Sequence, residues 1–368
     1  MSNEKIKLGI SHGDINGIGY EVIMKSLEDT RIFDICTPII YGSSKIAAYH
    51  RKALDLPNLV FNNIKKPDDA HHKRINIINC IDDEVRVELG KGTPVSGKAA
   101  FDALKKASED LVSGQIDVLV TAPIQKKVIQ SEQFSFPGHT EYLEDVARSG
   151  KSIMLMVSDK LKVGVVTGHL PLKDVAGSIT KDLIVEKLRI LNHTLLQDFS
   201  IRRPKIAVLG LNPHAGDDGL LGNEESDIII PAIESAKSEG IMAMGPYPAD
   251  GLFGSDNLKK FDAILAMYHD QGIAPFKTIA FTSGVNYTAG LNIIRTSPDH
   301  GTAYNLAGSN VADHTSFLNA MYLAVDVYKN RKIYEEISKN PLKSAGKEFF
   351  EGKDESVQDI IDEESEEN

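Results

Sequence analysis

The stretch Asp262-Ala-Ile-Leu-Ala-Met-Tyr-His-Asp-Gln-Gly272 decides the fold. One acid is followed by an unbroken apolar run to Tyr268, which is the pattern of a strand buried on both faces of a sheet. His269 and Asp270 stand where that strand would end. Because ligands of open α/β sheets bind beyond the carboxyl ends of the strands, the stretch predicts an α/β protein with a histidine and a carboxylate at its functional edge.

Two other apolar runs end in the same way. Residues 161–167 lead to His169, and residues 206–211 lead to His214. A single histidine in such a place is more often a hydrogen-bonded structural residue than a metal ligand. With His269 there are three in equivalent positions, which favours a shared metal site, because neutral imidazole binds borderline metals and three protein ligands leave an open catalytic position. The pattern alone leaves both interpretations open.

Length and composition bound the class of protein. The 368 residues suffice for two domains or one large α/β unit, and the hydrophobic fraction of 42% is ordinary for a soluble globular protein. The formal net charge of −11 argues against nucleic acid as the main partner. With no signal-like segment and no run long enough to cross a membrane, we expect a cytoplasmic protein without a membrane partner. Cys36 and Cys80 are expected to be buried free thiols.

Apolar periodicity and turn residues predict alternating strands and helices. Further strands are expected over residues 6–11, 37–41, 74–80, 116–121 and 152–157. The last of these would form a hairpin with the strand over 161–167, which would make the sheet mixed. Helices are expected over residues 20–27, 44–54, 94–113, 140–148, 181–195, 224–238 and 317–328. Residues 57–74 and 246–253 are predicted to be irregular, the second because of its two prolines.

A glycine-rich segment, His12-Gly-Asp-Ile-Asn-Gly-Ile-Gly19, follows the first predicted strand. Such a strand-to-helix turn can bind phosphate, because the N–H groups at a helix N-terminus point outward there. Its spacing is not G-x-G-x-x-G, so it is not the dinucleotide-binding fingerprint. A tight structural turn is therefore favoured over a phosphate site.

Isolated polar residues predict an anion-binding pocket. Lys277, Asn286 and Arg295 stand in mostly apolar surroundings. Arginine offers a bidentate fork for phosphate or carboxylate, and lysine offers a compact charge. His139 is expected at a helix N-terminus capped by Thr140, where outward N–H groups form a natural anion site, although an ordinary cap explains this pair more simply.

Two further features are left open by the pattern. Asp250 lies in the proline-flanked segment, where it could serve as a general base or a nicotinamide contact, and a turn-forming aspartate explains it equally well. Residues 346–368 are rich in Asp, Glu and Ser, and we expect them to form a disordered acidic tail after a single catalytic unit over residues 1–345.

The motifs together resemble those of one family, the 4-hydroxythreonine-4-phosphate dehydrogenases of pyridoxal 5′-phosphate biosynthesis. The resemblance covers roughly residues 7–329 and rests on eight motifs in order, which is specific although each motif alone is weak. The motifs are Phe136-Pro-Gly-His-Thr-Glu141, Thr167-Gly-His-Leu-Pro-Leu172, Leu211-Asn-Pro-His-Ala-Gly216, Pro248-Ala-Asp250, Ala266-Met-Tyr-His-Asp-Gln-Gly272, Gly284-Val-Asn286, Ile294-Arg-Thr-Ser297 and Asp299-His-Gly-Thr-Ala303. Two segments depart from the family pattern: residues 57–86, and residues 12–16, where the family would have a Pro-Gly-Glu-Pro-Ala type of segment.

The resemblance implies an architecture like that of the isocitrate and isopropylmalate dehydrogenases, with two α/β subdomains, a mixed sheet and a cleft between the subdomains. It also implies a homodimer whose active site lies at the subunit interface and combines residues of both subunits. The implied contacts are a divalent metal (zinc, magnesium, manganese or cobalt) at His169, His214 and His269, the phosphorylated substrate at His139, Thr140, Lys277, Asn286 and Arg295, and NAD or NADP at Asp299, Gly301 and Thr302.

The implied reaction is the oxidation of 4-phosphooxy-L-threonine by NAD(P)+. The product, 2-amino-3-oxo-4-phosphooxybutanoate, would lose CO2 to give 3-amino-2-oxopropyl phosphate. Asp270 could orient His269, and Lys277 or Asp250 could transfer a proton. Related enzymes acting on 4-phosphothreonate or 4-phosphoerythronate share the motifs, so these substrates are alternatives. A metal-dependent phosphohydrolase and a non-catalytic phosphate-binding module are less favoured.

Overall fold

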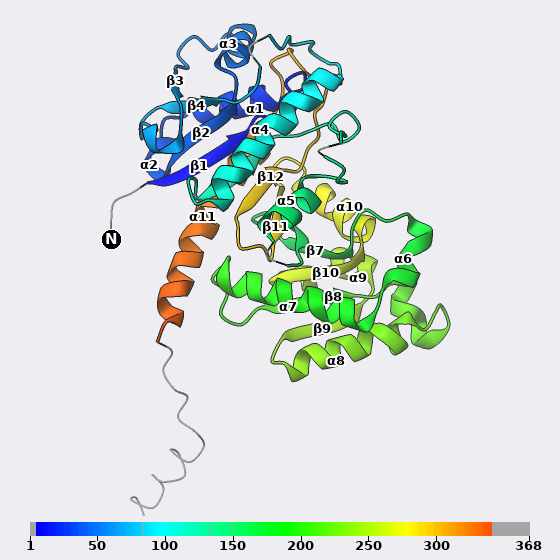
Figure 1. The fold of residues 1–368 in the computed structure, drawn as a ribbon. Coiled ribbons are helices and arrows are strands. Elements are labelled where there is room, and N and C mark those ends of the chain that lie inside the picture. The colour runs from blue at the N-terminus through cyan, green and yellow to red at the C-terminus, as the bar shows by residue number, and fades with distance from the viewer. Residues whose placement is uncertain (1–4, 83, 133, 149, 341–368) are drawn as a thin grey trace, which may run out of the picture. The chain divides into compact units, whose positions relative to one another are not determined.

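The computed structural model describes residues 5–340 except 83, 133 and 149, and Figure 1 shows how its elements are arranged. The chain forms two units, residues 1–331 and 332–368. Every described strand belongs to the first unit. The predicted acidic tail lies outside the described residues, and the boundary at residue 345 stays a prediction. No helix in the described ranges is long and apolar enough to cross a membrane.

The described strands form one mixed twelve-stranded sheet in the order β3-β4-β2-β1-β5-β12-β11-β6-β7-β10-β8-β9. A first parallel block contains β3 (Phe61–Ile64), β4 (Ile75–Asn79), β2 (Cys36–Gly42), β1 (Ile6–Ser11), β5 (Val118–Thr121) and β12 (Arg295–Pro298). A second contains β7 (Lys162–Thr167), β10 (Ala263–Tyr268), β8 (Lys205–Leu209) and β9 (Met242–Tyr247). Antiparallel pairing through β11 (Val285–Ala289) and β6 (Ile153–Val157) joins the two blocks. The α/β class, the mixed sheet and the predicted β6–β7 hairpin are confirmed.

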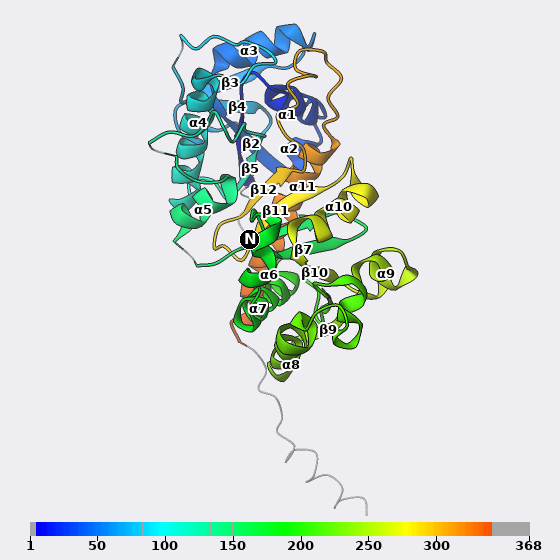
Figure 2. The ribbon, with the colours of Figure 1, turned by 90° about the vertical axis from the view of Figure 1, so that its right-hand side faces the viewer.

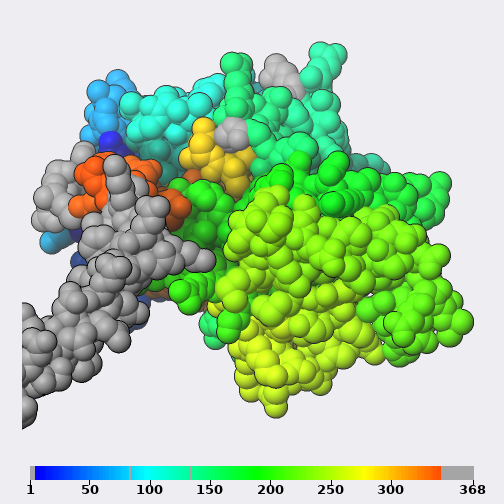
Figure 3. All heavy atoms as spheres, turned by 90° about the horizontal axis from the view of Figure 1, so that it is seen from below, coloured from blue at the N-terminus to red at the C-terminus, as the bar shows by residue number. Residues whose placement is uncertain are grey.

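Helices cover both faces of this sheet. In chain order they are α1 (Gly19–Glu28), α2 (Ile32–Ile35), α3 (Ser44–Ala53), α4 (Pro94–Val112), α5 (His139–Ala147), α6 (Leu172–Ser178), α7 (Lys181–Gln197), α8 (Ile230–Ser238), α9 (Ala249–Phe253), α10 (His269–Ala280) and α11 (Thr315–Ser338). Figure 2 shows α7 and α10 on opposite sides of β7 and β10. Seen from below, the chain around α8 (yellow-green) forms the surface beside the edge strand β9 (Figure 3).

The apolar core is continuous on one face of the sheet and divided on the other. Successive residues of a strand point to opposite faces. Accordingly, Val120 of β5 packs in the continuous core together with Tyr287 of β11, whereas Leu119 faces the other way. On that second face, one apolar cluster packs under α4 and α5, and a separate one packs under α9 and α10. Among the described residues, no single apolar core therefore spans the central strands on that face.

The N-termini of α3 and α7 have a side-chain cap, and that of α5 lacks the cap that the sequence predicts. Ser43 and Thr180 each accept a hydrogen bond from a first-turn N–H group, which stabilises the starts of α3 and α7. The predicted cap at Thr140 is wrong, because α5 begins at His139 and its N-cap residue is Gly138. Thr140 lies inside the first turn. Because the N-cap residue Gly138 has no side chain, the N-terminal N–H groups of α5 have no side-chain cap.

The two segments predicted to be irregular contain regular structure at the two edges of the sheet. Residues 57–74 include β3, whose polar side chains are tolerated because an edge strand is half open to solvent. Residues 246–253 include the end of β9, the other edge strand, and the short helix α9. Pro246 lies on the edge strand, where a missing N–H group is tolerated, and Pro248 directly precedes α9, where the helix needs no N–H group.

The glycine-rich turn after β1 is held by a buried carboxylate. Asp14 accepts hydrogen bonds from the Asn16 N–H group at 2.8 Å, from Ser96 Oγ at 3.0 Å and from Tyr304 Oη at 2.6 Å. These bonds tie the turn to the first turn of α4 and to the loop before α11. A buried carboxylate repels phosphate, so the structure agrees with the interpretation as a structural turn.

A buried stack of rings in the same region makes the stability of the fold depend on pH. His12 and Tyr20 have ring centroids 5.2 Å apart, and Tyr20 and His50 have centroids 5.0 Å apart. Burial lowers the pKa of both histidines from 6.5 to about 4. Between these values the unfolded chain binds more protons than the folded chain. The stabilisation from keeping these rings neutral is therefore complete above pH 6.5 and is lost as the pH falls toward 4.

We predict that lowering the pH from 7.5 to 5 reduces the free energy of unfolding by about 2 kcal/mol for each of the two histidines. Urea titrations at both pH values measure this difference. His12→Phe keeps an aromatic ring in the stack but cannot bind a proton, so it should remove about half of the pH dependence. The exposed His71→Phe is the control and should change nothing. An unaltered pH dependence in His12→Phe would contradict the assignment.

Candidate active site

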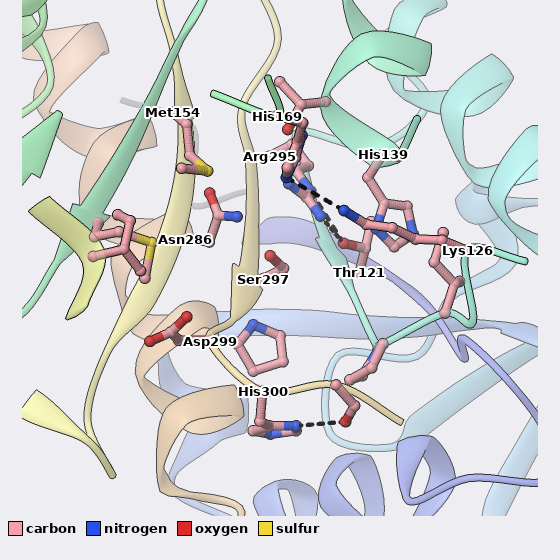
Figure 4. A pocket seen from close by; sticks show the side chains of 18 of the residues that line it. Thr121, Lys126, His139, Met154, His169, Asn286, Arg295, Ser297, Asp299 and His300 are labelled. Atoms are coloured by element: carbon pink, nitrogen blue, oxygen red, sulfur yellow. Dashed lines mark hydrogen bonds between the residues drawn. The ribbon is translucent and has the colours of Figure 1, made fainter. Parts of the chain in front are cut away.

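A cavity of about 260 Å³ lies over the central strands of the sheet, between the two separate apolar clusters (Figure 4). The strand register explains which side chains reach it. Asn286 of β11 pairs with Ser297 of β12 and with Met156 of β6, so these three side chains point to the same face. Arg295 and Met154 lie two residues away on the same strands and point to that face as well.

The walls of the cavity come from segments that are far apart in the sequence. They are the end of β5 and the segment after it (121–126), the N-terminus of α5, His169 shortly after β7, residues along α10 from His269 to Lys277, and the end of β12 with the loop after it (298–301). Both parallel blocks therefore contribute the ends of strands. The predicted site residues that line the cavity are His139, Thr140, His169, His269, Lys277, Asn286, Arg295, Asp299 and Gly301.

Arg295 carries a buried positive charge without a paired carboxylate. Its side chain is 2% exposed, and its guanidinium donates to Thr121 Oγ from Nε at 3.0 Å and from Nη2 at 2.6 Å, and to Thr288 Oγ from Nη1 at 3.2 Å. In the described part of the chain, no carboxylate forms an ion pair with it, and Glu141 acts on it only through its electric field. Burial lowers the pKa of Arg295 to about 9, which still leaves it charged at neutral pH. A buried cation of this kind is costly to keep, so a bound anion would be strongly favoured.

Neutral hydrogen-bonding groups surround this charge. His139 Nε2 and Asn286 Oδ1 are buried and have no hydrogen-bond partner among the described residues. Burial, with the nearby charges of Arg295 and Lys126, holds the pKa of His139 well below its ordinary value, so the ring is neutral and carries one N–H donor. His139 also opens α5, whose uncapped first N–H groups favour an anion. These groups are suited to binding an anion through several hydrogen bonds.

Lys277 and Asp299 form an ion pair in the lining of the cavity. Lys277 Nζ donates to the Asp299 carbonyl oxygen at 2.9 Å and lies 3.0 Å from Asp299 Oδ1. Burial raises the pKa of Asp299, and the charge of Lys277 opposes that rise. The pair joins α10 to the loop after β12, so the predicted substrate and cofactor contacts are neighbours here.

Two of the three predicted metal ligands lie together. His169 and His269 follow the neighbouring parallel strands β7 and β10, and their ring centroids are 5.8 Å apart. Nδ1 of His269 lies 2.7 Å from Asp270 Oδ1, and Nδ1 of His169 lies 3.4 Å from Glu141 Oε1. A carboxylate on Nδ1 fixes the orientation of an imidazole and leaves Nε2 for a metal. Asp270 therefore lies where its predicted orienting role requires it.

The third predicted ligand, His214, does not join the other two within one chain. It follows β8, which pairs with β10, but it lies outside the cavity lining. His214 has a φ of 54°, and the four residues after it also have positive φ, so the segment forms a left-handed turn. Within the described ranges, no three His, Cys, Asp or Glu side chains form a group that could hold a metal ion. The imidazoles suit a borderline divalent metal, but one chain arranges only two of them for it.

Two other predicted residues lie outside the cavity lining. Asp250 is on α9, whose Leu252 packs in one apolar cluster with residues of β8. The Thr302 carbonyl oxygen accepts a hydrogen bond from the Ile18 N–H group at 3.1 Å, so this residue packs against the turn after β1. Asp299 and Gly301, the other predicted cofactor contacts, do line the cavity.

The sequence assigns no role to several polar residues of the cavity, among them Thr121, Lys126, Glu141 and His300. Lys126 Nζ lies 3.3 Å from His169 Nε2, and both Glu141 Oε2 and His300 Nε2 are buried without a hydrogen-bond partner among the described residues. A signal for Thr121 was available, because it lies at the carboxyl end of a buried strand, and the three histidines likewise follow buried strands. For Glu141 and His300 the residue spacing carries no comparable signal.

Comparison with known proteins shows the family to which the chain belongs. The sequence model of the family described as "Pyridoxal phosphate biosynthetic protein PdxA" matches residues 34–324. A 4-hydroxythreonine-4-phosphate dehydrogenase of Bacteroides thetaiotaomicron is 53% identical over 99% of this chain and 100% of that protein. A protein of Oceanobacillus iheyensis that is named for the dehydrogenation of D-threonate 4-phosphate is 41% identical over 89% of this chain and 99% of that protein.

A solved structure gives the same result for the fold. The 4-hydroxythreonine-4-phosphate dehydrogenase of Klebsiella pneumoniae superposes with a TM-score of 0.76 and 31% identity, over 89% of this chain and 98% of that chain. The family resemblance expected from the eight motifs is therefore confirmed. The chain belongs to the family of the pyridoxal phosphate biosynthetic protein PdxA and is an oxidoreductase.

Proposed function

We propose that the protein is an NAD(P)- and divalent-metal-dependent dehydrogenase of 4-phosphooxy-L-threonine. It would oxidise the C3 alcohol to 2-amino-3-oxo-4-phosphooxybutanoate, which then decarboxylates to 3-amino-2-oxopropyl phosphate. The observation that carries the proposal is the buried Arg295 guanidinium, which has hydroxyl partners but no paired carboxylate among the described residues. A phosphate dianion in the cavity would supply the missing counter-charge.

The phosphate end of the substrate fits the part of the cavity around Arg295. His139 offers a neutral N–H donor, and the amide of Asn286 can turn its NH₂ group toward an acceptor. Thr140 adds a first-turn N–H group of α5, and Lys277 could exchange its contact with Asp299 for the phosphate. Hydrogen bonds from several sides would fix the phosphate, and through it the position of the reacting carbon.

The reacting end of the substrate would then lie toward His169 and His269. A divalent metal bound there would polarise the alcohol oxygen that loses its proton. Among the described residues, the three histidines do not converge within one chain. We therefore propose that histidines from two copies of the chain complete the metal site, which would then lie at the interface of a homodimer. Asp270 and Glu141 would hold two of the rings in orientation.

The cofactor is proposed to bind along the loop after β12. Asp299 and Gly301 line the cavity, and His300 Nε2 is a buried polar atom that a cofactor could satisfy. Thr302 would support this loop from behind. Lys277 lines the cavity and could transfer a proton from the alcohol, whereas Asp250 lies outside the lining and is the weaker candidate for that role.

The proposed alternative is a dehydrogenase of 4-phosphothreonate or 4-phosphoerythronate. The name of the relative from Oceanobacillus iheyensis favours it, and the phosphate-binding groups would serve these substrates equally well because all carry the same phosphate. A phosphohydrolase with two metals would need several carboxylates around the ions, and in the described residues only Glu141 and Asp299 line the cavity as carboxylates. We further propose a cytoplasmic location, in keeping with the free thiols of Cys36 and Cys80.

We predict that the metal-loaded protein reduces NAD+ or NADP+ with 4-phosphooxy-L-threonine, measured as a rise in absorbance at 340 nm. A chelator should abolish the signal, and adding back a divalent metal should restore it. The sugar-acid phosphates would run in parallel, and a signal with them alone would select the alternative substrates.

His214→Ala should lose both bound metal and turnover. Normal metal content and turnover in a folded His214→Ala protein would contradict the three-histidine assignment.

We also predict that Arg295→Met raises KM for the phosphorylated substrate at least about 30-fold, because a buried charge partner of the phosphate is lost. Its unfolding temperature should not fall, since the substitution removes a buried charge that has no paired carboxylate. Arg331→Met is the matched control on the opposite face, where Arg331 pairs with the buried Asp198 at 2.7 Å.

The control should behave in the opposite way. Arg331→Met leaves Asp198 buried without its partner, so it should lower the free energy of unfolding by about 3–5 kcal/mol while KM stays nearly unchanged. Steady-state kinetics and thermal melts of the two variants measure both effects. An Arg295→Met protein that is destabilised but keeps its KM would mean that Arg295 is a structural residue.

A further inference from the structure

Thr121 is the residue on which the Arg295 guanidinium rests, and nothing in the reaction described so far uses it. We infer that Thr121 is a further substrate-binding residue, which fixes Arg295 by accepting two of its N–H groups and donates its own hydroxyl proton to the substrate phosphate. This inference rests on the proposed binding of a phosphorylated substrate in the cavity and names a contact within it.

The contact with Arg295 does not involve the hydroxyl proton of Thr121. Nε and Nη2 of Arg295 lie 3.0 and 2.6 Å from Thr121 Oγ, so the two N–H groups take both lone pairs of one oxygen. A threonine hydroxyl has one further bonding capacity, its O–H proton. That proton must point away from the guanidinium, because the guanidinium has only donors.

No protein group accepts this proton among the residues that the structure describes. Thr121 is fully buried, yet it lines the cavity at the carboxyl end of β5, so the space in front of its hydroxyl is the cavity itself. Figure 4 shows Thr121 beside Arg295 and His139, and Nε2 of His139 is buried without a hydrogen-bond partner among the described residues. A buried donor without an acceptor is costly, so the occupant of the cavity is expected to supply the acceptor.

The charges of the neighbouring groups determine what kind of occupant this is. Arg295 and Lys126 are cationic, and His139 and Thr121 offer neutral donors. The acceptor must therefore be rich in lone pairs and negatively charged, which describes a phosphate oxygen better than a hydroxyl or an ammonium group. Thr288 contacts only Nη1, at 3.2 Å, so Thr121 is the principal support of the guanidinium.

The chain offers a matched control one residue from Arg295. Thr296 is also fully buried, and its Oγ donates to the Ala320 carbonyl oxygen at 2.7 Å on the opposite face of the sheet. Thr296→Val removes a buried hydroxyl from the same strand without touching the cavity. Thr121→Val removes the hydroxyl in the cavity while keeping the side-chain shape, and Thr121→Ser restores the hydroxyl.

The experiment measures the dissociation constant of inorganic phosphate by titration calorimetry and the kinetics with 4-phosphooxy-L-threonine, for the full-length variants. Thr121→Val should weaken phosphate binding and raise KM by roughly 10- to 100-fold, with kcat changed much less. Thr121→Ser should stay within about threefold of wild type on the same scale. Thr296→Val should bind phosphate like wild type, even if it melts at a lower temperature. If Thr121→Val does not fold, Thr121→Ala takes its place with the same expectation.

Two results would overturn the inference. One is a Thr121→Val protein that binds phosphate as tightly as Thr296→Val does, and the other is a Thr121→Ser protein as weak as Thr121→Val. Failure of the proposed function would look different. In that case the wild type would bind phosphate in a Thr121-dependent way but would not reduce NAD+ or NADP+ with any of the three phosphorylated acids.

Discussion

The site depends on one buried positive charge that the protein itself does not neutralise. Arg295 sits on a central strand with hydroxyl partners on its guanidinium, and in the described chain no carboxylate pairs with it. Neighbouring polar groups, among them His139 and Asn286, also have buried atoms without a hydrogen-bond partner among the described residues. A ligand that satisfies all of them at once gains much more than a surface ion pair would give. The protein without ligand is therefore less stable than it could be, and its affinity for a ligand is higher, which is common at functional sites.

The sheet explains why such a place exists. Two parallel blocks meet through the antiparallel strands β11 and β6, and among the described residues the apolar packing on one face divides into a cluster under α4 and α5 and another under α9 and α10. The opposite face keeps a continuous apolar core, which holds the blocks together. The cavity therefore opens on the central strands, where β12 presents Arg295 and Ser297. The segments after β5, β7, β10 and β12 supply the walls, and they bring residues from both halves of the chain to one cavity.

How far the sequence predicts this structure differs from one feature to the next. The apolar run before His269 forms the expected buried strand. The longer helices and the β6–β7 hairpin could also be predicted, because the sequence patterns that indicate them are local. The misassigned segments lie at the sheet edges, where β3 and β9 tolerate polar residues and prolines that a central strand would exclude. The pairing of Thr121 with Arg295 could not be predicted, because it depends on strand register across residues 174 apart in the chain. Likewise, placing His169, His214 and His269 at strand ends does not determine whether three rings converge in one chain.

The most direct test of the central claim is a crystal structure of the protein with 4-phosphooxy-L-threonine and a divalent metal. The account predicts that the phosphate lies against the Arg295 guanidinium, within hydrogen-bond distance of His139 and Asn286. A phosphate bound elsewhere, for example at the turn after β1, with the Arg295 end of the cavity filled by water, would contradict it.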